Sequence, residues 1–501
     1  MINSLKFWQK RKNKDSFKAV SLKVVTGFDL YYQLTYMCAV AAAGISRDRI
    51  FQLATDLGRA PSAYFGKVNT LSKELSYDYS RACHTVGADV KDEKMKSLLL
   101  RMASALVSGE PEADFLEQEA EITGIAYENE YERDLAALTK WTDAYAAIII
   151  SSALIVIINL ISTMIYEMGP GMIIGLMIVA VLTSIMGAWI LSRAAPREVR
   201  GVFSPDGPRI QRLAVRLGKI LPVGAGIISL LLLVFGLPLG LVLMLASVML
   251  LPLGVVSVSG DTQINKKDKE IGPFLRSLGG MTTSTGTTLT EALTRLNLNS
   301  FPALQDDVER LTRRLVAAIS PPLCWEKFAL ETGSKLISET IHIFNDAINL
   351  GGDPDKAGLF CAQFSSMTIQ LRDKRAVVTS TFTWLTVVMH AAIGGLVILI
   401  MGVIDQFLGL IMGVAESGGA EIAAEIASSV PLMSFGPAAI QLLHLMTLGM
   451  VLLLTVTNSF AILSADGGHI LKLSFFLCML MFVSGISFLG APIFIQTIMP
   501  R

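Results

Sequence analysis

The sequence lacks the short motifs by which many enzymes are recognised. It has no Walker A sequence GxxxxGK[ST], no HExxH and no GxSxG, which would hold ATP phosphates, a zinc ion or an activated serine. Its five cysteines show no CxxC spacing, and small buried apolar roles are their ordinary interpretation. We therefore expect no enzyme activity, no cofactor and no metal site.

Charge is also scarce. Charged residues make up only 17% of the 501 residues, whereas hydrophobic residues make up 52%. A soluble chain of this length would need more polar surface to stay dispersed, so the composition indicates a polytopic, all-α membrane protein. Windows of about 20 apolar residues predict seven transmembrane helices. They cover residues 144–166, 171–191, 220–236, 238–258, 380–404, 439–463 and 471–499.

Positive charge is distributed unevenly among the loops between these helices. Lys and Arg number 19 in residues 1–140, seven in 192–219 and 14 in 259–378, whereas loops 167–170, 236–239 and 405–436 contain none. The positive-inside rule therefore predicts a cytoplasmic N-terminus and an exterior C-terminus. The acidic loop 405–436 is then exterior. The first 20 residues lack an apolar core, so no cleavable signal is expected.

Two polar, helix-patterned stretches repeat one plan. In the first, the turn glycine Gly44 precedes Tyr64, Val68, Leu71 and Leu75 and then Gly109-Glu110-Pro111; in the second, Gly286 precedes Leu304, Val308, Leu311 and Leu315 and then Gly352-Asp353-Pro354. The apolar spacing is the same in both, and each stretch runs into a long apolar segment. This self-similarity predicts an internal duplication.

The chain is thus expected to have five parts. They are a basic tail (1–23), a first cytoplasmic helical repeat (24–140), four transmembrane helices with a basic loop at 192–219 (141–258), a second cytoplasmic repeat (259–378) and three transmembrane helices with the acidic exterior loop (379–501). The tail either rests on anionic lipid headgroups or is solvated.

Clusters of like charge are the candidate partner-binding residues. Ten acidic residues between Glu110 and Asp134 accompany one base, Arg133, in what is predicted to be a long helix. This helix presents either a solvated face or a docking surface for a basic partner or for the other repeat. The acidic candidates are Glu117, Glu121 and Glu128.

The basic candidates lie in two regions. Arg209, Arg212 and Arg216 stand at helical spacing and either set the membrane topology or form a cationic stripe for lipid or an acidic partner. The second repeat contributes Lys266, Lys267, Lys269, Arg310, Arg313 and Arg314. Residues 1–140 and residues 259–378 are each charge-neutral, with 19 bases against 19 acids in the first and 14 against 14 in the second, so we expect no nucleic-acid binding.

Two histidines, His390 and His444, fall within predicted transmembrane helices. An ionisable group within a transmembrane helix is by default a candidate functional residue. No carboxylate lies within the predicted helices to complete a proton relay, so hydrogen bonding between helices is the favoured interpretation. Asn159 and Asn458 are polar groups of the same kind.

The arrangement resembles a known family. Two helical repeats, each with a turn of the type seen in Ser284-Thr285-Gly286-Thr287-Thr288-Leu289 and a G-x-P element, are similar to type II secretion system F-domain proteins. These are membrane platforms of type IV filament machines. Four transmembrane helices between the repeats and three after the second are closest to the archaeal branch, which serves the archaellum and archaeal pili.

The resemblance implies a scaffold that contains no nucleotide site of its own. It implies a hexameric secretion ATPase and pilin- or archaellin-like subunits as partners, with membrane lipid around the helices. Small-residue stretches at Gly224-Ala225-Gly226 and Gly394-Gly395 suggest a homodimer. A transporter with a polar site at the membrane midplane is the alternative, and an intramembrane enzyme using His390 or His444 is a third possibility.

Overall fold

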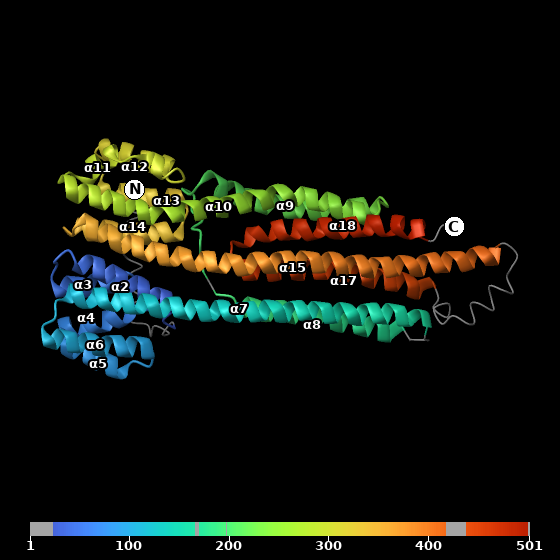
Figure 1. Ribbon diagram of the computed structural model, residues 1–501, viewed down its shortest axis with the longest axis horizontal. Helices are drawn as coiled ribbons and strands as arrows, with labels where there is room; N and C mark the ends of the chain where they lie inside the picture. Colours follow the sequence, from blue (N-terminus) through green and yellow to red (C-terminus); the bar gives the residue numbers. More distant parts are fainter. Residues whose placement is uncertain (1–23, 166–169, 197, 417–436, 499–501) are drawn as a thin grey trace. The chain divides into compact units, whose positions relative to one another are not determined.

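The computed structural model describes residues 24–165, 170–196, 198–416 and 437–498 (Figure 1). Within these ranges the chain is helical and contains no β-strand, which confirms the predicted fold class. Seven of the helices are long and apolar enough to cross a membrane, the number that the apolar blocks predicted. The protein is therefore a multi-pass membrane protein. The basic tail lies outside the described residues.

The chain divides into two compact units. Unit 1 contains the described residues of Met1–Tyr131 and Lys266–Leu371, and unit 2 those of Glu132–Asn265 and Arg372–Arg501. The helices that lie wholly in unit 1 are α2 (Gly27–Ala41), α3 (Arg47–Asp56), α4 (Ser62–Leu75), α5 (Tyr79–Asp89), α6 (Glu93–Ser108), α11 (Leu289–Arg295), η1 (Leu298–Ser300), α12 (Gln305–Val316), α13 (Pro321–Thr332) and α14 (Lys335–Asn349).

Unit 2 contains most of the apolar helices. Those that lie wholly within it are α8 (Pro170–Ala194), α9 (Arg209–Val234), α17 (Pro437–Asp466), η3 (Ile470–Lys472) and α18 (Leu473–Ile498). Three longer helices contribute residues to both units, namely α7 (Glu112–Ile165), α10 (Leu239–Thr285) and α15 (Pro354–Glu416).

The helices of the two predicted repeats follow one another in the same order. A left-handed glycine precedes each set of short helices, with φ of 69° at Gly44 and 62° at Gly286. Gly109 ends α6 at φ 76°. In the second repeat the left-handed residue is Gly351, with φ 90°, one position before the Gly352 of the G-x-P element.

Gly352 is instead required by close packing. A Cβ there would lie 2.8 Å from the carbonyl oxygen of Ala347 and 3.2 Å from the Cβ of Ala43. The prolines of the two G-x-P elements stand where long helices begin, since α7 starts directly after Pro111 and α15 starts at Pro354. Proline suits a helix start because its missing N–H has no intrahelical partner there.

One hydrophobic core joins both repeats within unit 1. It includes Phe65 and Met95 from the first repeat and Trp325, Phe328 and Phe344 from the second, all almost fully buried. Cys83 and Cys324, one from each predicted repeat, are both buried in it, as predicted. Burial of this apolar surface is the main force that holds the two repeats together.

Glycines let α10 and α15 approach closely in unit 1. A Cβ on Gly279 would clash with the carbonyl of Pro354, and a Cβ on Gly358 would lie 2.6 Å from the carbonyl oxygen of Leu275. Backbones can meet this closely only where a side chain is absent.

Two features of unit 2 differ from, or add to, the sequence predictions. Residues from Asp405 to Glu416, predicted as the start of an exterior loop, continue α15; the remainder of that loop lies outside the described residues. Only 6% of the most apolar window of α9 is buried in the protein, against 33–50% for the other six apolar helices. An exposed apolar helix is stable in lipid, which is as apolar as its side chains.

Candidate functional site

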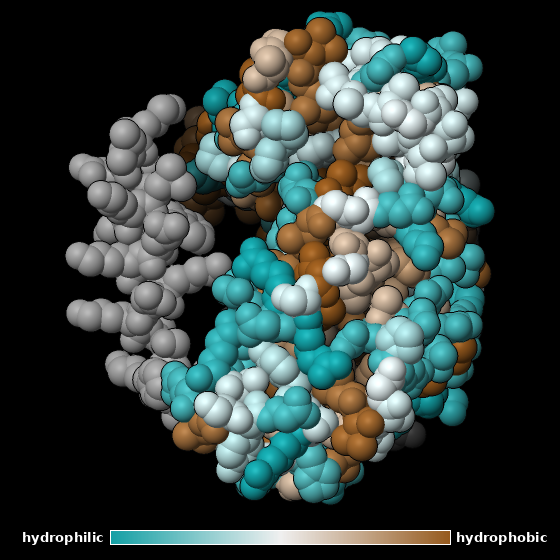
Figure 2. Space-filling view, turned by 90° about the vertical axis from the view of Figure 1, so that its left-hand side faces the viewer, coloured by the Kyte–Doolittle hydropathy of each residue, from teal (hydrophilic) through white to brown (hydrophobic). Residues whose placement is uncertain are grey.

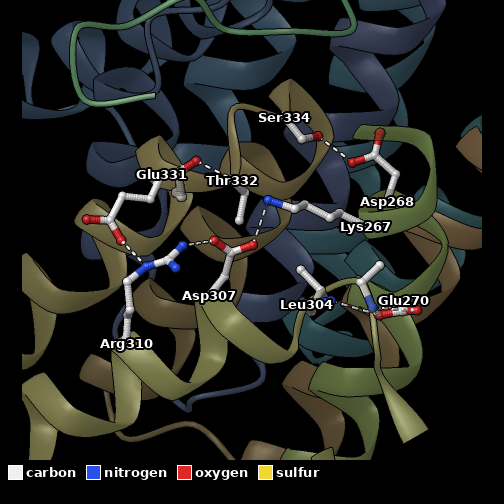
Figure 3. A network of polar contacts seen from close by, with 11 residues as sticks. Lys267, Asp268, Glu270, Leu304, Asp307, Arg310, Glu331, Thr332 and Ser334 are labelled. Carbon is white, nitrogen blue, oxygen red and sulfur yellow. Dashed lines mark hydrogen bonds and ion pairs between the residues drawn. The ribbon is translucent and has the colours of Figure 1, made fainter. Parts of the chain in front are cut away.

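A short charged segment of α10 organises the second repeat (Figure 3). The Lys267 ammonium lies 2.7 Å from the Asp307 carboxylate on α12. Asp268 accepts a hydrogen bond from the Ser334 hydroxyl, and Ser334 caps the first turn of α14. The Glu270 carboxylate accepts the backbone N–H groups that precede α12. Three neighbouring residues of one helix thus position two other helices.

Asp307 is the centre of this network and is only 2% exposed. It forms ion pairs with Lys267 and with Arg310, and Arg310 also reaches Glu331 at 3.3 Å. Burial raises the pKa of Asp307, and Lys267 opposes that rise. A buried carboxylate needs such partners to remain charged.

The predicted basic candidates therefore separate into two groups. Lys267, Arg310 and Arg314 form ion pairs inside the second repeat, with Arg314 2.5 Å from Glu331. Lys266 and Lys269 are exposed. Arg313 is 78% exposed and, among the residues that the structure describes, forms an ion pair only along its own helix, with Glu309. Lys266, Lys269 and Arg313 are therefore the basic candidates of the second repeat that a partner can reach.

The acidic candidates on α7 are divided in the same way. Glu119 is buried and accepts two hydrogen bonds from Arg101, at 2.6 and 2.7 Å. Three further acids pair with bases, in the ion pairs Glu112–Arg47, Glu130–Lys94 and Glu132–Lys374. Glu117 and Glu121 are exposed, and Glu128 is half-buried. The acidic stretch is thus partly a set of internal pairs and partly an open surface.

The basic stripe of α9 is exposed as predicted. Arg209, Arg212 and Arg216 are exposed at the start of the helix, while Gln211 and Ala214 between them are buried. The apolar part of the helix follows directly. Cationic residues beside an apolar helix are suited to anionic lipid headgroups.

The contact between the two repeats was missed by the sequence analysis. Arg59 of the first repeat pairs with Glu339 on α14 and with Asp29, at 3.0 Å. Tyr36 donates a hydrogen bond of 2.8 Å to Asp346, also on α14. Burial raises the pKa of Glu339, and Arg59 counters that rise. The only sequence signal for this contact was Glu339, a glutamate among the apolar positions of an amphipathic helix.

A polar cluster inside unit 2 accounts for His390. Its Nε2 lies 2.9 Å from the Ser484 hydroxyl and 3.3 Å from that of Thr455, and its Nδ1 lies 3.2 Å from the Asn458 amide. Asn458 in turn accepts from the Tyr145 hydroxyl at 2.8 Å. Side chains of α7, α15, α17 and α18 are thereby joined, which agrees with the favoured interpretation of hydrogen bonding between helices.

His444 has a carboxylate partner that the sequence analysis did not foresee. Its Nε2 lies 2.9 Å from Asp405. The prediction that no acid accompanies it was wrong because α15 extends past residue 404 and carries Asp405 within reach. Both side chains are nearly half exposed, so the pair lies at a surface of unit 2 rather than in its core.

Arg375 caps a helix end in unit 2. Its guanidinium is fully buried and donates to the carbonyl oxygens of Ala465, Pro196 and Ser464, at 2.9, 2.8 and 3.2 Å. Two of these belong to the last turn of α17, where carbonyl groups lack intrahelical partners. The positive charge of Arg375 therefore has a structural role.

Comparison with known proteins gives one consistent relationship. The chain is 22% identical over 419 residues to Flagella accessory protein J of Methanococcus voltae, covering 80% of this chain and 73% of that protein. It is 21% identical over 422 residues to Flagella accessory protein J of Methanocaldococcus jannaschii, covering 80% and 72%. No family model matches the chain. No solved structure matches it.

Proposed function

We propose that the protein is a membrane platform of an archaeal filament-assembly machine, of the archaellum or pilus type. The observation that carries this proposal is similarity over four fifths of the chain to two proteins named Flagella accessory protein J. The match covers too much of the chain to come from apolar segments alone. The seven apolar helices are what a scaffold in the membrane requires.

In this proposal unit 1 is cytoplasmic and receives a secretion ATPase, while unit 2 holds pilin-like subunits in the membrane. Helices α7, α10 and α15, which contribute residues to both units, support this division. Lys266 and Arg313 are the residues we assign to the ATPase contact, because both side chains are exposed and Arg313 pairs with Glu309 of its own helix. The protein itself performs no catalysis.

The test is co-purification with a secretion ATPase from the same organism. We expect the full-length protein in detergent to retain the ATPase, and Lys266→Glu combined with Arg313→Glu to reduce the retained amount at least fivefold. Lys67→Glu on the first repeat is the matched exposed control. If ATPase retention is the same for all three proteins, the assigned contact is wrong; if deletion of the gene leaves surface filaments intact, the platform function is wrong.

A further inference from the structure

Unit 1 contains a groove of about 780 Å³ between the two repeats. Helices α2 and α7 of the first repeat and α10 and α15 of the second line it. Buried side chains of Cys38 and Phe360 form part of its floor, together with Met367. Figure 2 shows the end of the molecule that carries the short helices of unit 1, where hydrophilic residues predominate and hydrophobic residues show between them.

The groove has walls of opposite charge. Glu117 and Glu121 line it from α7, and Lys269 and Arg276 line it from α10. All four side chains are exposed. Within the described part of the chain, Glu117, Glu121 and Arg276 form no ion pair and no hydrogen bond. Elsewhere in unit 1 the repeats meet through matched charges, as in the Arg59–Glu339 pair.

The lining of α15 indicates the shape of an occupant. It runs from Leu359 to Gln370, a stretch of 12 residues or about 18 Å of helix. Apolar floor residues between polar walls are the pattern that receives an amphipathic helix, whose side chains at i, i+3, i+4 and i+7 point into a groove.

The charges exclude other occupants. The acidic wall repels phosphate, and hence nucleic acid and anionic lipid. The chain's own residues 1–23 contain seven bases and one acid, so they would place like charges against Lys269 and Arg276.

We propose that this groove binds an amphipathic helix of about 12 residues from a partner protein. The helix carries basic side chains on the flank that faces α7 and carboxylates on the flank that faces α10. Because the two walls differ in sign, the charges also fix the direction in which the helix lies. This inference concerns unit 1 alone and holds whichever machine the protein serves.

The test uses the full-length protein in nanodiscs and three fluorescent 14-residue helical peptides with one common apolar face. One peptide has Lys on one flank and Glu on the other, the second has Lys on both flanks and the third has Glu on both. We expect the mixed peptide to bind about tenfold more tightly than either of the others, because several partly desolvated ion pairs together supply a difference of that size. Fluorescence anisotropy gives the three Kd values.

A charge exchange makes the test independent of folding defects. Glu117→Lys combined with Glu121→Lys makes both walls basic, so the peptide with Glu on both flanks should become the tightest ligand. Glu117→Gln with Glu121→Gln leaves only the α10 wall charged, so the mixed peptide and the peptide with Glu on both flanks should bind equally, and both more tightly than the peptide with Lys on both flanks. Lys67→Glu, at an exposed position of the first repeat outside the groove lining, should leave all three Kd values unchanged.

Two outcomes would overturn the proposal. In the first, the three peptides bind with equal Kd values to the wild-type protein and also to the charge-exchanged variant. In the second, cysteines introduced at Glu121 and Arg276 form a disulfide in the absence of peptide, which would show that the walls close on each other and that the groove has no separate occupant.

Discussion

At the scale of single residues, burial decides which charges are structural. Asp307, Glu119 and Glu339 are 2–4% exposed, and each pairs with a base from another helix or turn. Their exposed neighbours along the sequence make weaker contacts that solvent screens. A single charged cluster in the sequence can therefore contain both residues that form internal ion pairs and residues that a partner can reach.

Removal of the Asp307 carboxylate should destabilise the second repeat. Asp307→Ala leaves Lys267 partly buried without its acceptor, so we expect a loss of about 2–4 kcal/mol in the free energy of opening of α12 and α13. Hydrogen exchange of their amides measures this. Arg313→Ala on the same helix, where the side chain is 78% exposed, should change the opening free energy by less than about 0.5 kcal/mol. Equal effects would show that the network does not stabilise the repeat.

The Cys83 thiol should resist labelling. Burial raises its pKa to about 12, so at pH 7 its thiolate fraction is about a thousandfold below that of an ordinary thiol. The reaction rate with a maleimide should rise with pH, because the thiolate fraction grows about tenfold per unit below the pKa. A cysteine at the 59% exposed position Leu75 should label rapidly. Comparable labelling at pH 7 would mean that unit 1 opens readily around Cys83.

At the scale of helices, close backbone approach and capping determine how elements meet. The crossing of α10 and α15 depends on glycines in both helices, and the end of α17 depends on the Arg375 guanidinium. Each case satisfies a general requirement, either space for a backbone or donors for unpaired carbonyl groups. Both contacts join segments far apart in the sequence.

Two helical glycines provide a matched comparison. Gly279→Ala would place a methyl group against the carbonyl of Pro354, so we expect a loss of at least about 2 kcal/mol in stability. Gly224→Ala meets nothing within 4 Å and should be neutral or stabilise by up to about 1 kcal/mol. Thermal unfolding of the purified proteins in detergent compares them. A lower Tm for Gly224→Ala than for Gly279→Ala would contradict the described crossing.

At the scale of the whole molecule, the shared core has a consequence for topology. Unit 1 buries side chains from both predicted repeats in a single core, so the two repeats cannot lie on opposite sides of a membrane. The distribution of Lys and Arg predicts that this side is the cytoplasm.

Cysteines introduced at Leu75 and Val316, which are 59% and 62% exposed, should therefore label from the same side. We expect an impermeant maleimide to reach both in inside-out vesicles and neither in intact cells. Labelling of one position from each side would refute the shared core. Labelling of both from outside would leave the core intact and reverse the predicted orientation.

The sequence by itself determined the features that depend on local pattern. Block length indicated seven apolar helices, periodicity indicated an all-α fold, and glycine marked turns at Gly44 and Gly286, which are both left-handed in the structure. These follow from the length of a membrane span and from backbone sterics, which act over a few residues.

Only the tertiary structure decided which charges are free and how the repeats meet. Arg59 and Glu339 are 280 positions apart, and nothing in either neighbourhood marks them as a pair. The same holds for Arg375, whose carbonyl partners lie on other segments, and for the groove, whose walls come from both repeats. Burial and ion pairing depend on which surfaces the fold brings together, and local composition does not encode that.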